Sequence, residues 1–308
     1  MQGALALAAP ATTEWRWAVG AQVDPASHGI VDLGIRYRGF SAQVLTDTLD
    51  LRYRHRVSQG EWQFGARLAL FGAELLFSPW ENNAPAPEEA LRAGYLGADI
   101  SRAWWFSDGR YIGLSSELRH YTFGAWREST RDIPDATLRA RTGVKLGIWR
   151  RDLQTEILVG HLIEGARHGG WIEARLESPP RPGWGLANRT HLGWSTGLTR
   201  LSRFRLGGLN PYVVPFGGLG WAQYWVERYV VQRLGAAFSA NTVPLDLQLG
   251  TDIGFWDRAE LQVSMVAAAR FKLGVYECAM MGGMTALRDG QADFGNWSLF
   301  FWFERPWG

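Results

Sequence analysis

Residues 243–255 alternate between apolar and polar side chains almost without interruption. The apolar members are Val243, Leu245, Leu247, Leu249, Ile253 and Phe255, and the polar or small members are Asp246, Gln248, Gly250, Asp252 and Gly254. Successive side chains of a β-strand point to opposite faces, so this segment would have one apolar and one polar side. Because the pattern recurs along nearly the whole chain, it predicts a transmembrane β-barrel with lipid outside and a polar interior.

The alternation predicts about 16 antiparallel strands in a single domain, residues 14–308. The last four strands are expected at 243–256, 258–273, 275–288 and 293–304. Between 197 and 242 the alternation weakens, which predicts a Gly-rich loop followed by one strand around 220–233. The Pro-rich segment from Glu81 to Glu89 is expected to be a long loop rather than a strand, and 124–135 a second long loop. The fold class is therefore all-β, and we expect the sheet to close because an open sheet of this size would leave unpaired edges.

The composition agrees with a membrane barrel and excludes a helical membrane protein. No stretch approaches the roughly 20 apolar residues that a spanning helix needs. The chain contains 17 Trp and 37 Gly; we expect the aromatic residues at the two membrane interfaces and the glycines where strands curve. A Trp-rich soluble lectin or propeller is the alternative. The single cysteine, Cys278, excludes an intramolecular disulfide and a cysteine-based metal site.

The first residues, Met1 to Ala11, are small and apolar and contain two Ala-x-Ala patterns. This segment, taken as residues 1–13, is interpreted either as the remnant of a secretory signal peptide or as a disordered N-terminus.

Arginine is common on the polar face of the expected strands. The residues expected to make the lumen basic are Arg52, Arg54, Arg56, Arg67, Arg139 and Arg141. One interpretation is a lumen cross-linked by ion pairs with acidic residues such as Asp50 and Glu117. The other is a channel that favours anions. The sequence leaves both open, because the outcome depends on how charges pair across the lumen.

A local motif lies in the weakly alternating region. Phe204-Arg205-Leu206-Gly207-Gly208 is followed by a loop, by a strand containing Glu227, and by Thr251-Asp252-Ile253-Gly254. This order resembles the bacterial surface antigen superfamily of outer-membrane barrels, which includes BamA-type insertases, two-partner secretion transporters and the barrel tails of patatin-like proteins. The aromatic-rich final strand, Asn296 to Glu304, resembles the signal by which such barrels are recognised for assembly, although the chain continues past Phe303.

The resemblance implies a loop that folds back into the lumen. Its residues would be Gly207, Gly208, Pro211, Tyr212, Pro215, Phe216, Gly217 and Gly218. The wall that receives it would contain Asp252 and Gly254. The sequence departs from the family pattern twice: no arginine occurs in 212–216, where the loop arginine is expected, and Gly250 stands at the position of an aromatic residue.

The resemblance also implies a function and partners. We expect a barrel that moves or inserts polypeptide or lipid at the outer membrane. Strands begin near Glu14, so the chain is expected to be a barrel-only relative or one whose periplasmic partner is a separate chain. Outer-membrane lipid and the barrel-assembly machinery are the other expected partners. A passive anion-preferring pore and a non-conducting structural barrel are the alternatives.

Enzymatic, metal, cofactor and nucleic-acid functions are not expected. His191 and Ser195 lie on one face of one expected strand but roughly 13 Å apart, too far to share a hydrogen bond. His55, His120, His161 and His168 have no evident catalytic grouping. No nucleophile-elbow, phosphate-loop or zinc motif occurs, and the arginines form no basic helix.

Overall fold

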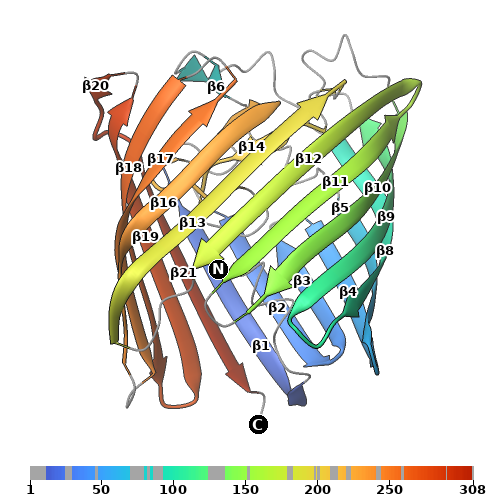
Figure 1. The fold of residues 1–308 in the computed structure, drawn as a ribbon, viewed down its shortest axis with the longest axis horizontal. Helices are drawn as coiled ribbons and strands as arrows, with labels where there is room; N and C mark the ends of the chain where they lie inside the picture. Colours follow the sequence, from blue (N-terminus) through green and yellow to red (C-terminus); the bar gives the residue numbers. More distant parts are fainter. Residues whose placement is uncertain are drawn as a thin grey trace.

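The computed structural model describes residues 12–24, 30–45, 48–69, 80–81, 84–85, 93–123, 136–150, 153–178, 183–197, 199, 202–208, 214–219, 223–240, 244–257, 260–288 and 290–306. Within these residues sixteen antiparallel strands form one closed barrel (Figure 1). The wall strands are β1 (Thr12–Val23), β2 (Ile30–Arg38), β3 (Phe40–Leu45), β4 (Thr48–Val57), β5 (Gly60–Ala69), β8 (Ala93–Trp105), β9 (Arg110–Phe123), β10 (Ala136–Trp149), β11 (Gln154–Glu164), β12 (Arg167–Ser178), β13 (Gly183–Thr196), β16 (Arg228–Ser239), β17 (Leu245–Trp256), β18 (Glu260–Leu273), β19 (Tyr276–Arg288) and β21 (Trp297–Pro306). The predicted fold class is confirmed.

Each wall strand pairs with its neighbours in chain order, and β21 pairs with β1 to close the barrel. The closing register runs from Arg16 opposite Pro306 to Val23 opposite Leu299. Three short pairs lie outside this wall pattern: β6 (Trp80–Glu81) with β7 (Ala84–Pro85), β14 (Phe204–Leu206) with β15 (Tyr224–Val226), and β20 (Gln291–Ala292) against the end of β19.

The structure corrects three sequence expectations. The segment from Glu81 to Glu89 contains part of the β6–β7 pair, although it was expected to hold no strand. The short strand β3 was missed, because six residues carry too little alternation to stand out. The strand expected around 220–233 is the wall strand β16, which begins only at Arg228. The apolar run from Tyr224 to Val226 belongs to the separate strand β15, whose three residues are all buried.

The two ends of the barrel differ in their connections. At the end where β1 begins and β21 finishes, every connection between wall strands has five residues or fewer. At the opposite end, uppermost in Figure 1, several gaps between consecutive wall strands are longer: β8 begins 24 residues after the end of β5, and β10 begins 13 residues after the end of β9. Outer-membrane barrels have short periplasmic turns and longer extracellular loops. The end that holds β1's start is therefore the periplasmic end.

The outer surface of the wall is apolar, as the alternation predicts. On β17, Leu247, Leu249 and Phe255 are 41%, 62% and 44% exposed, whereas Asp252 on the alternate face is fully buried inside the barrel. Apolar residues are exposed in the same alternation on neighbouring strands. None of the described residues forms a helix long and apolar enough to cross a membrane. A closed barrel with this exterior belongs in the bacterial outer membrane.

Several aromatic side chains lie inside the barrel rather than in an interfacial girdle. Each covers a glycine on the neighbouring strand: a Cβ atom added at Gly160 would lie 2.5 Å from the Trp171 ring, and one at Gly147 would lie 2.5 Å from Tyr111 Cζ. The ring of Tyr229 covers Gly193 in the same way. The high Trp and Gly contents are thus partly explained by aromatic–glycine pairs that fill the inner wall.

Candidate functional site

The connection between β13 and β16 leaves the wall at the extracellular end and turns back into the lumen. We call its described residues, within 197–227, the luminal loop. Its start is fixed by Glu164 of β11, whose carboxylate accepts hydrogen bonds from the hydroxyls of Thr199 and Ser202. Its end is fixed by Asp257, whose carboxylate accepts hydrogen bonds from the backbone N–H groups of Glu227 (3.0 Å) and Arg228 (2.8 Å). Both ends of the loop are therefore tied to the extracellular rim.

The loop has its own secondary structure and apolar core. Strand β14 pairs with β15, and single bridges join Leu206 to Val214 and Gly208 to Phe216. Loop residues pack with inward side chains of four wall strands in one buried cluster. The cluster contains Phe204, Leu206, Phe216, Leu219, Tyr224 and Val226 from the loop, and Leu162, Trp171, Tyr229, Val231 and Trp256 from β11, β12, β16 and β17. The lumen is therefore not uniformly polar, because these inward side chains of β11, β12, β16 and β17 form an apolar surface that the loop covers.

A buried ion pair lies where the loop meets β17. Arg233 of β16 is directly opposite Asp252 of β17, and its Nε and Nη2 atoms lie 2.5 and 2.6 Å from the two carboxylate oxygens. The same carboxylate accepts the Gly217 backbone N–H at 2.8 Å. Arg233 and Asp252 are 3% and 0% exposed. The two-point geometry satisfies both charges in a place that water does not reach.

Close backbone packing completes the docking. A Cβ atom at Gly254 would lie 2.5 Å from the Phe216 ring, and one at Gly283 would lie 2.5 Å from the Cα atom of Gly217. Gly218, which has a positive φ of 75°, donates its N–H to Ser298 Oγ (3.1 Å), and its carbonyl accepts from Thr285 Oγ1 (3.2 Å). The loop therefore lies directly on the backbones of β17 and β19, which only glycine allows.

The structure brings most of the predicted loop and wall residues together. Gly207, Gly208, Phe216, Gly217 and Gly218 are buried and Pro215 is half-buried, whereas Pro211 and Tyr212 lie outside the described residues. Asp252 and Gly254 both contact the loop.

Sequence reasoning missed Arg233. The arginine that pairs with Asp252 comes from the wall and not from the loop. One sequence signal could have indicated this pairing: Arg233 lies on the inward face of the wall strand that comes directly before the strand of Asp252. The expected position of that strand, around 220–233, put Arg233 at its very end.

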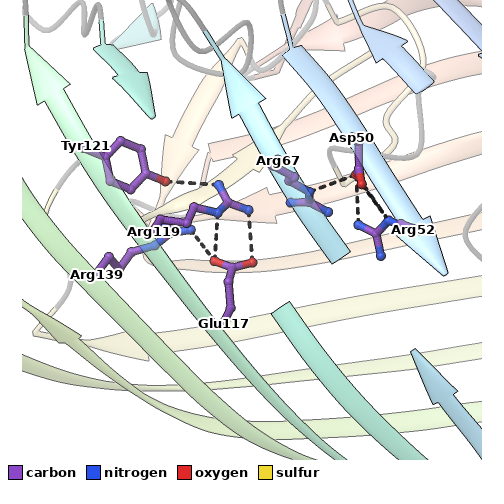
Figure 2. A network of polar contacts seen from close by, with 7 residues as sticks. All are labelled: Asp50, Arg52, Arg67, Glu117, Arg119, Tyr121 and Arg139. Atoms are coloured by element: carbon purple, nitrogen blue, oxygen red, sulfur yellow. Dashed lines mark hydrogen bonds and ion pairs between the residues drawn. The ribbon is translucent and has the colours of Figure 1, made fainter. Parts of the chain in front are cut away.

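The arginines of the lumen share carboxylates in pairs. Asp50 binds Arg52 (3.0 Å) and Arg67 (2.8 Å), and Glu117 binds Arg119 (2.9 Å) and Arg139 (2.8 Å). Figure 2 shows these two groups, in which each carboxylate lies between guanidinium groups. Glu177 binds Arg175 and Arg189 in the same way, and Glu304 binds Arg16 and Arg36. We call these four groups the arginine triads; in each, two guanidinium groups share one carboxylate, and Arg16 also lies 3.3 Å from Glu277.

The remaining predicted basic residues have different surroundings. Arg141 lies 3.8 Å from Glu173 and over the Trp171 ring, 3.6 Å from its centroid. Arg56 lies 3.4 Å from Glu61 and its side chain is 56% exposed. Arg54 has no carboxylate within 4.0 Å among the described residues. Ion pairing therefore occurs in this lumen, and a channel that favours anions stays a prediction.

The histidine and serine considered for catalysis both face the lumen. Ser195 donates its hydroxyl hydrogen to the Glu227 carbonyl (3.0 Å), at the end of the luminal loop. His191 is half-buried. The expectation that the chain is not an enzyme stays a prediction.

The fold and the docked loop define the class: a sixteen-stranded outer-membrane barrel whose lumen holds an inward-folded loop. No protein-family model matches the sequence, and no curated protein matches it. Solved structures with this fold include CdiB from Acinetobacter baumannii (TM-score 0.64, 10% identity, 96% of this chain and 60% of that chain). BamA from Haemophilus ducreyi lacking POTRA domains 1–3 is similar at a TM-score of 0.66, with 9% identity, over 95% of this chain and 70% of that chain.

A third structure, described as a bacterial polysaccharide outer membrane secretin, has a TM-score of 0.54 and 8% identity, over 96% of this chain and 99% of that chain. The chain thus spans 60% of the CdiB chain and 70% of the BamA chain. At these identities the likeness shows the fold. The expected resemblance to BamA-type and two-partner secretion barrels is confirmed at that level.

Proposed function

We propose that this barrel transfers polypeptides across or into the outer membrane, together with a periplasmic partner. The observation that carries the proposal is the luminal loop held on Asp252 of β17. The resemblance to the surface antigen superfamily implies a loop that folds back onto this wall, and here the loop contacts Asp252 through the Gly217 backbone while the paired arginine, Arg233, comes from the wall. The barrel has the fold of BamA and CdiB.

The division of the lumen supports this function. The loop is buried against β11, β12, β16 and β17, whereas β4, β5, β9 and β10 carry the charged groups of Figure 2. A passage for a polypeptide would therefore run along the charged wall, with the loop as a fixed part of the opposite wall. A hydrated, ionic surface suits an unfolded chain, because it offers exchangeable hydrogen bonds and no large apolar patch that would trap it.

Depletion of the protein in its host bacterium tests the proposal. We expect the loss of particular polypeptides from the outer membrane or the medium, measured by quantitative mass spectrometry of each fraction, with restoration by the wild-type gene. An unchanged polypeptide profile in fully depleted cells would overturn the proposal. A changed lipid composition with an unchanged polypeptide profile would instead identify lipid as the cargo.

An anion-preferring pore is the second candidate, and it is favoured by Arg54, which faces the lumen and has no carboxylate within 4.0 Å among the described residues. In planar bilayers such a pore gives steady current with a reversal potential that indicates anion selectivity. Arg54→Gln should lower that selectivity. Arg102→Gln is the matched control, because Arg102 lies on the outer face near the same end and stacks on Trp62 and Trp104. A silent bilayer, or equal selectivity in both variants, would count against the pore.

A further inference from the structure

Arg102 is an outward-facing arginine near the periplasmic end of β8. It alternates with Ile100, which is exposed on the outer surface, and it lies directly opposite Trp62 of β5 and Leu114 of β9. These neighbours belong to the apolar exterior that meets lipid. A guanidinium group in such a place is costly unless an anion balances its charge.

The described part of the chain offers this guanidinium group no carboxylate. Among the described residues of β4, β5, β8 and β9, the outward positions carry no Asp or Glu. The carboxylates of these strands, such as those of Glu61, Asp99 and Glu117, occupy inward positions on the other side of the sheet. One nitrogen of Arg102, Nη1, is buried and has no hydrogen-bond partner among the described residues. Arg102 therefore differs from the arginines of the triads, which share carboxylates.

Two tryptophan rings hold the guanidinium group in position. The Cζ atom of Arg102 lies 5.0 Å from the centroid of the Trp62 ring and 5.3 Å from that of Trp104, which is two residues along β8 on the same face. A cation over an indole ring is attracted to the face of the ring, and stacking leaves the N–H groups at the edge of the guanidinium plane able to donate hydrogen bonds. The side chain is thus oriented before a ligand arrives, which limits the entropy lost on binding.

The depth of this site in the membrane indicates which chemical group it meets. β8 ends at Trp105 and β5 begins at Gly60, both at the periplasmic end of the wall. Arg102 therefore lies at the periplasmic edge of the apolar band, where aromatic side chains mark the membrane–water interface. The anionic group that a lipid carries at this depth is its phosphate. Arginine is well suited to bind it, because its N–H groups match the phosphate oxygens in pairs.

We propose that Arg102, Trp62 and Trp104 bind the phosphate headgroup of an anionic phospholipid in the periplasmic leaflet of the outer membrane. The guanidinium group donates hydrogen bonds to the phosphate. The acyl chains lie along apolar residues that continue the outer face toward the extracellular end, among them Phe64 and Ile100. A lipid with net negative charge is preferred, because the site has one positive charge and no carboxylate from the described strands around it. The site lies outside the lumen, so the inference does not depend on the proposed function.

Native mass spectrometry of the full-length barrel, released from detergent micelles, tests the site by counting bound lipids. The probes are phosphatidylglycerol and phosphatidylcholine with identical acyl chains, which differ in net charge because choline carries its own cation. We expect the first phosphatidylglycerol to bind about tenfold more tightly than phosphatidylcholine, as one charge-assisted contact would produce. Equal affinity of the wild-type barrel for the two lipids would overturn the proposal.

Variants of the barrel locate the binding. Arg102→Gln should lower the affinity for phosphatidylglycerol about tenfold and change that for phosphatidylcholine little. Arg110→Gln is the matched control: it removes a positive charge at the same end, but Arg110 pairs with Asp108 on the exposed turn. Trp104→Leu keeps an apolar side chain and should also weaken binding, because it removes one stacking ring. Unchanged affinity in Arg102→Gln, or an equal loss in Arg110→Gln, would overturn the assignment.

Heat-modifiable gel migration shows whether each variant is folded. Arg102→Lys takes the place of Arg102→Gln if the latter does not fold. Lysine keeps the charge but lacks the planar group that stacks and donates in pairs, so binding of phosphatidylglycerol should still be weaker than in the wild type. Wild-type affinity in a folded Arg102→Lys barrel would show that the two indole rings do not orient the charge as proposed.

Two further probes separate the possible sources of the phosphate. Glycerol phosphate has the same anionic group without acyl chains, and lipid A carries its phosphates in the opposite leaflet. We expect an excess of glycerol phosphate to leave phosphatidylglycerol bound. Displacement by glycerol phosphate would identify a site for soluble anions, and Arg102-dependent binding that is tighter for lipid A than for phosphatidylglycerol would identify a site for lipopolysaccharide. Either result would overturn the proposal.

Discussion

Arg233 and Asp252 lie opposite each other on adjacent strands and form an ion pair through two hydrogen bonds. The Asp252 carboxylate also accepts a hydrogen bond from the Gly217 backbone N–H of the luminal loop. The charge that balances Asp252 is thus part of the wall, and the loop contributes only a backbone donor. A barrel with this arrangement keeps its buried carboxylate paired whatever the position of the loop.

Asp252→Ala should destabilise the barrel by about 3–5 kcal/mol, because it leaves the buried Arg233 guanidinium without a counter-charge. The measurement is the temperature at which the folded band converts to the unfolded band in heat-modifiable gel migration. The double substitution Asp252→Ala and Arg233→Leu should recover much of the loss, since no unpaired charge remains. A wild-type transition in Asp252→Ala would show that the pair is not buried as described.

Gly283→Ala should displace the luminal loop, because the new methyl group would meet the Cα atom of Gly217 at 2.5 Å and the Gly218 nitrogen at 2.7 Å. We expect faster cleavage of the loop by protease added outside intact cells, at a cost of about 1–3 kcal/mol in stability. Gly282→Ala is the control: it lies one residue away on the outer face, where the nearest side-chain atom would be 3.4 Å distant. Equal cleavage of the two variants would contradict the docking described for Gly283.

Glu304→Gln should weaken the closure of the barrel. Glu304 of β21 is 1% exposed and binds Arg16 of β1 and Arg36 of β2, so one carboxylate joins three strands across the closing seam. Loss of its charge should lower the free energy of unfolding by about 1–3 kcal/mol, seen as a lower gel-transition temperature. Asp108→Asn removes an exposed ion pair with Arg110 and should leave the transition unchanged. A Glu304→Gln barrel as heat-resistant as the Asp108→Asn barrel would contradict a role in closure.

Cys278 should be inert in the folded barrel, because its side chain is only 2% exposed on β19. A maleimide reagent is expected to label it only after heating in detergent, as measured by a mass shift. Rapid labelling of the folded protein would show that β19 does not pack as described.

Strand positions could be predicted where one face meets lipid and the other meets the lumen. β17 is the clearest case, because its apolar and polar residues alternate and the structure places them outside and inside as expected. Strand positions were not predicted where a strand is too short to show the alternation or does not have one face toward lipid and one toward the lumen. β3 is too short to show a period, and β15 is buried on both faces, so its apolar run could not be separated from the following wall strand.

The candidate site was predictable only in part. The resemblance suggested that Gly217 and Asp252 belong together, and the structure joins them by a hydrogen bond. The arginine that pairs with Asp252 was not predictable in the same way. The family pattern implies an arginine from the loop, whereas the structure supplies Arg233 from β16. A pocket lined by residues 56–61, Trp105 and Trp149 had no sequence signal, since its residues come from strands that are far apart in the sequence.

By itself the sequence determined that the chain forms alternating strands, that these close into a barrel in the outer membrane, and that arginines face its lumen. These properties follow from the period of two and from the chemistry of each side chain. Only the tertiary structure decided which arginine meets which carboxylate and which strands of the wall the loop covers. Those contacts depend on strand register and on how the loop folds back across the wall, and neither is set by the local alternation of residues such as Leu247 and Gln248.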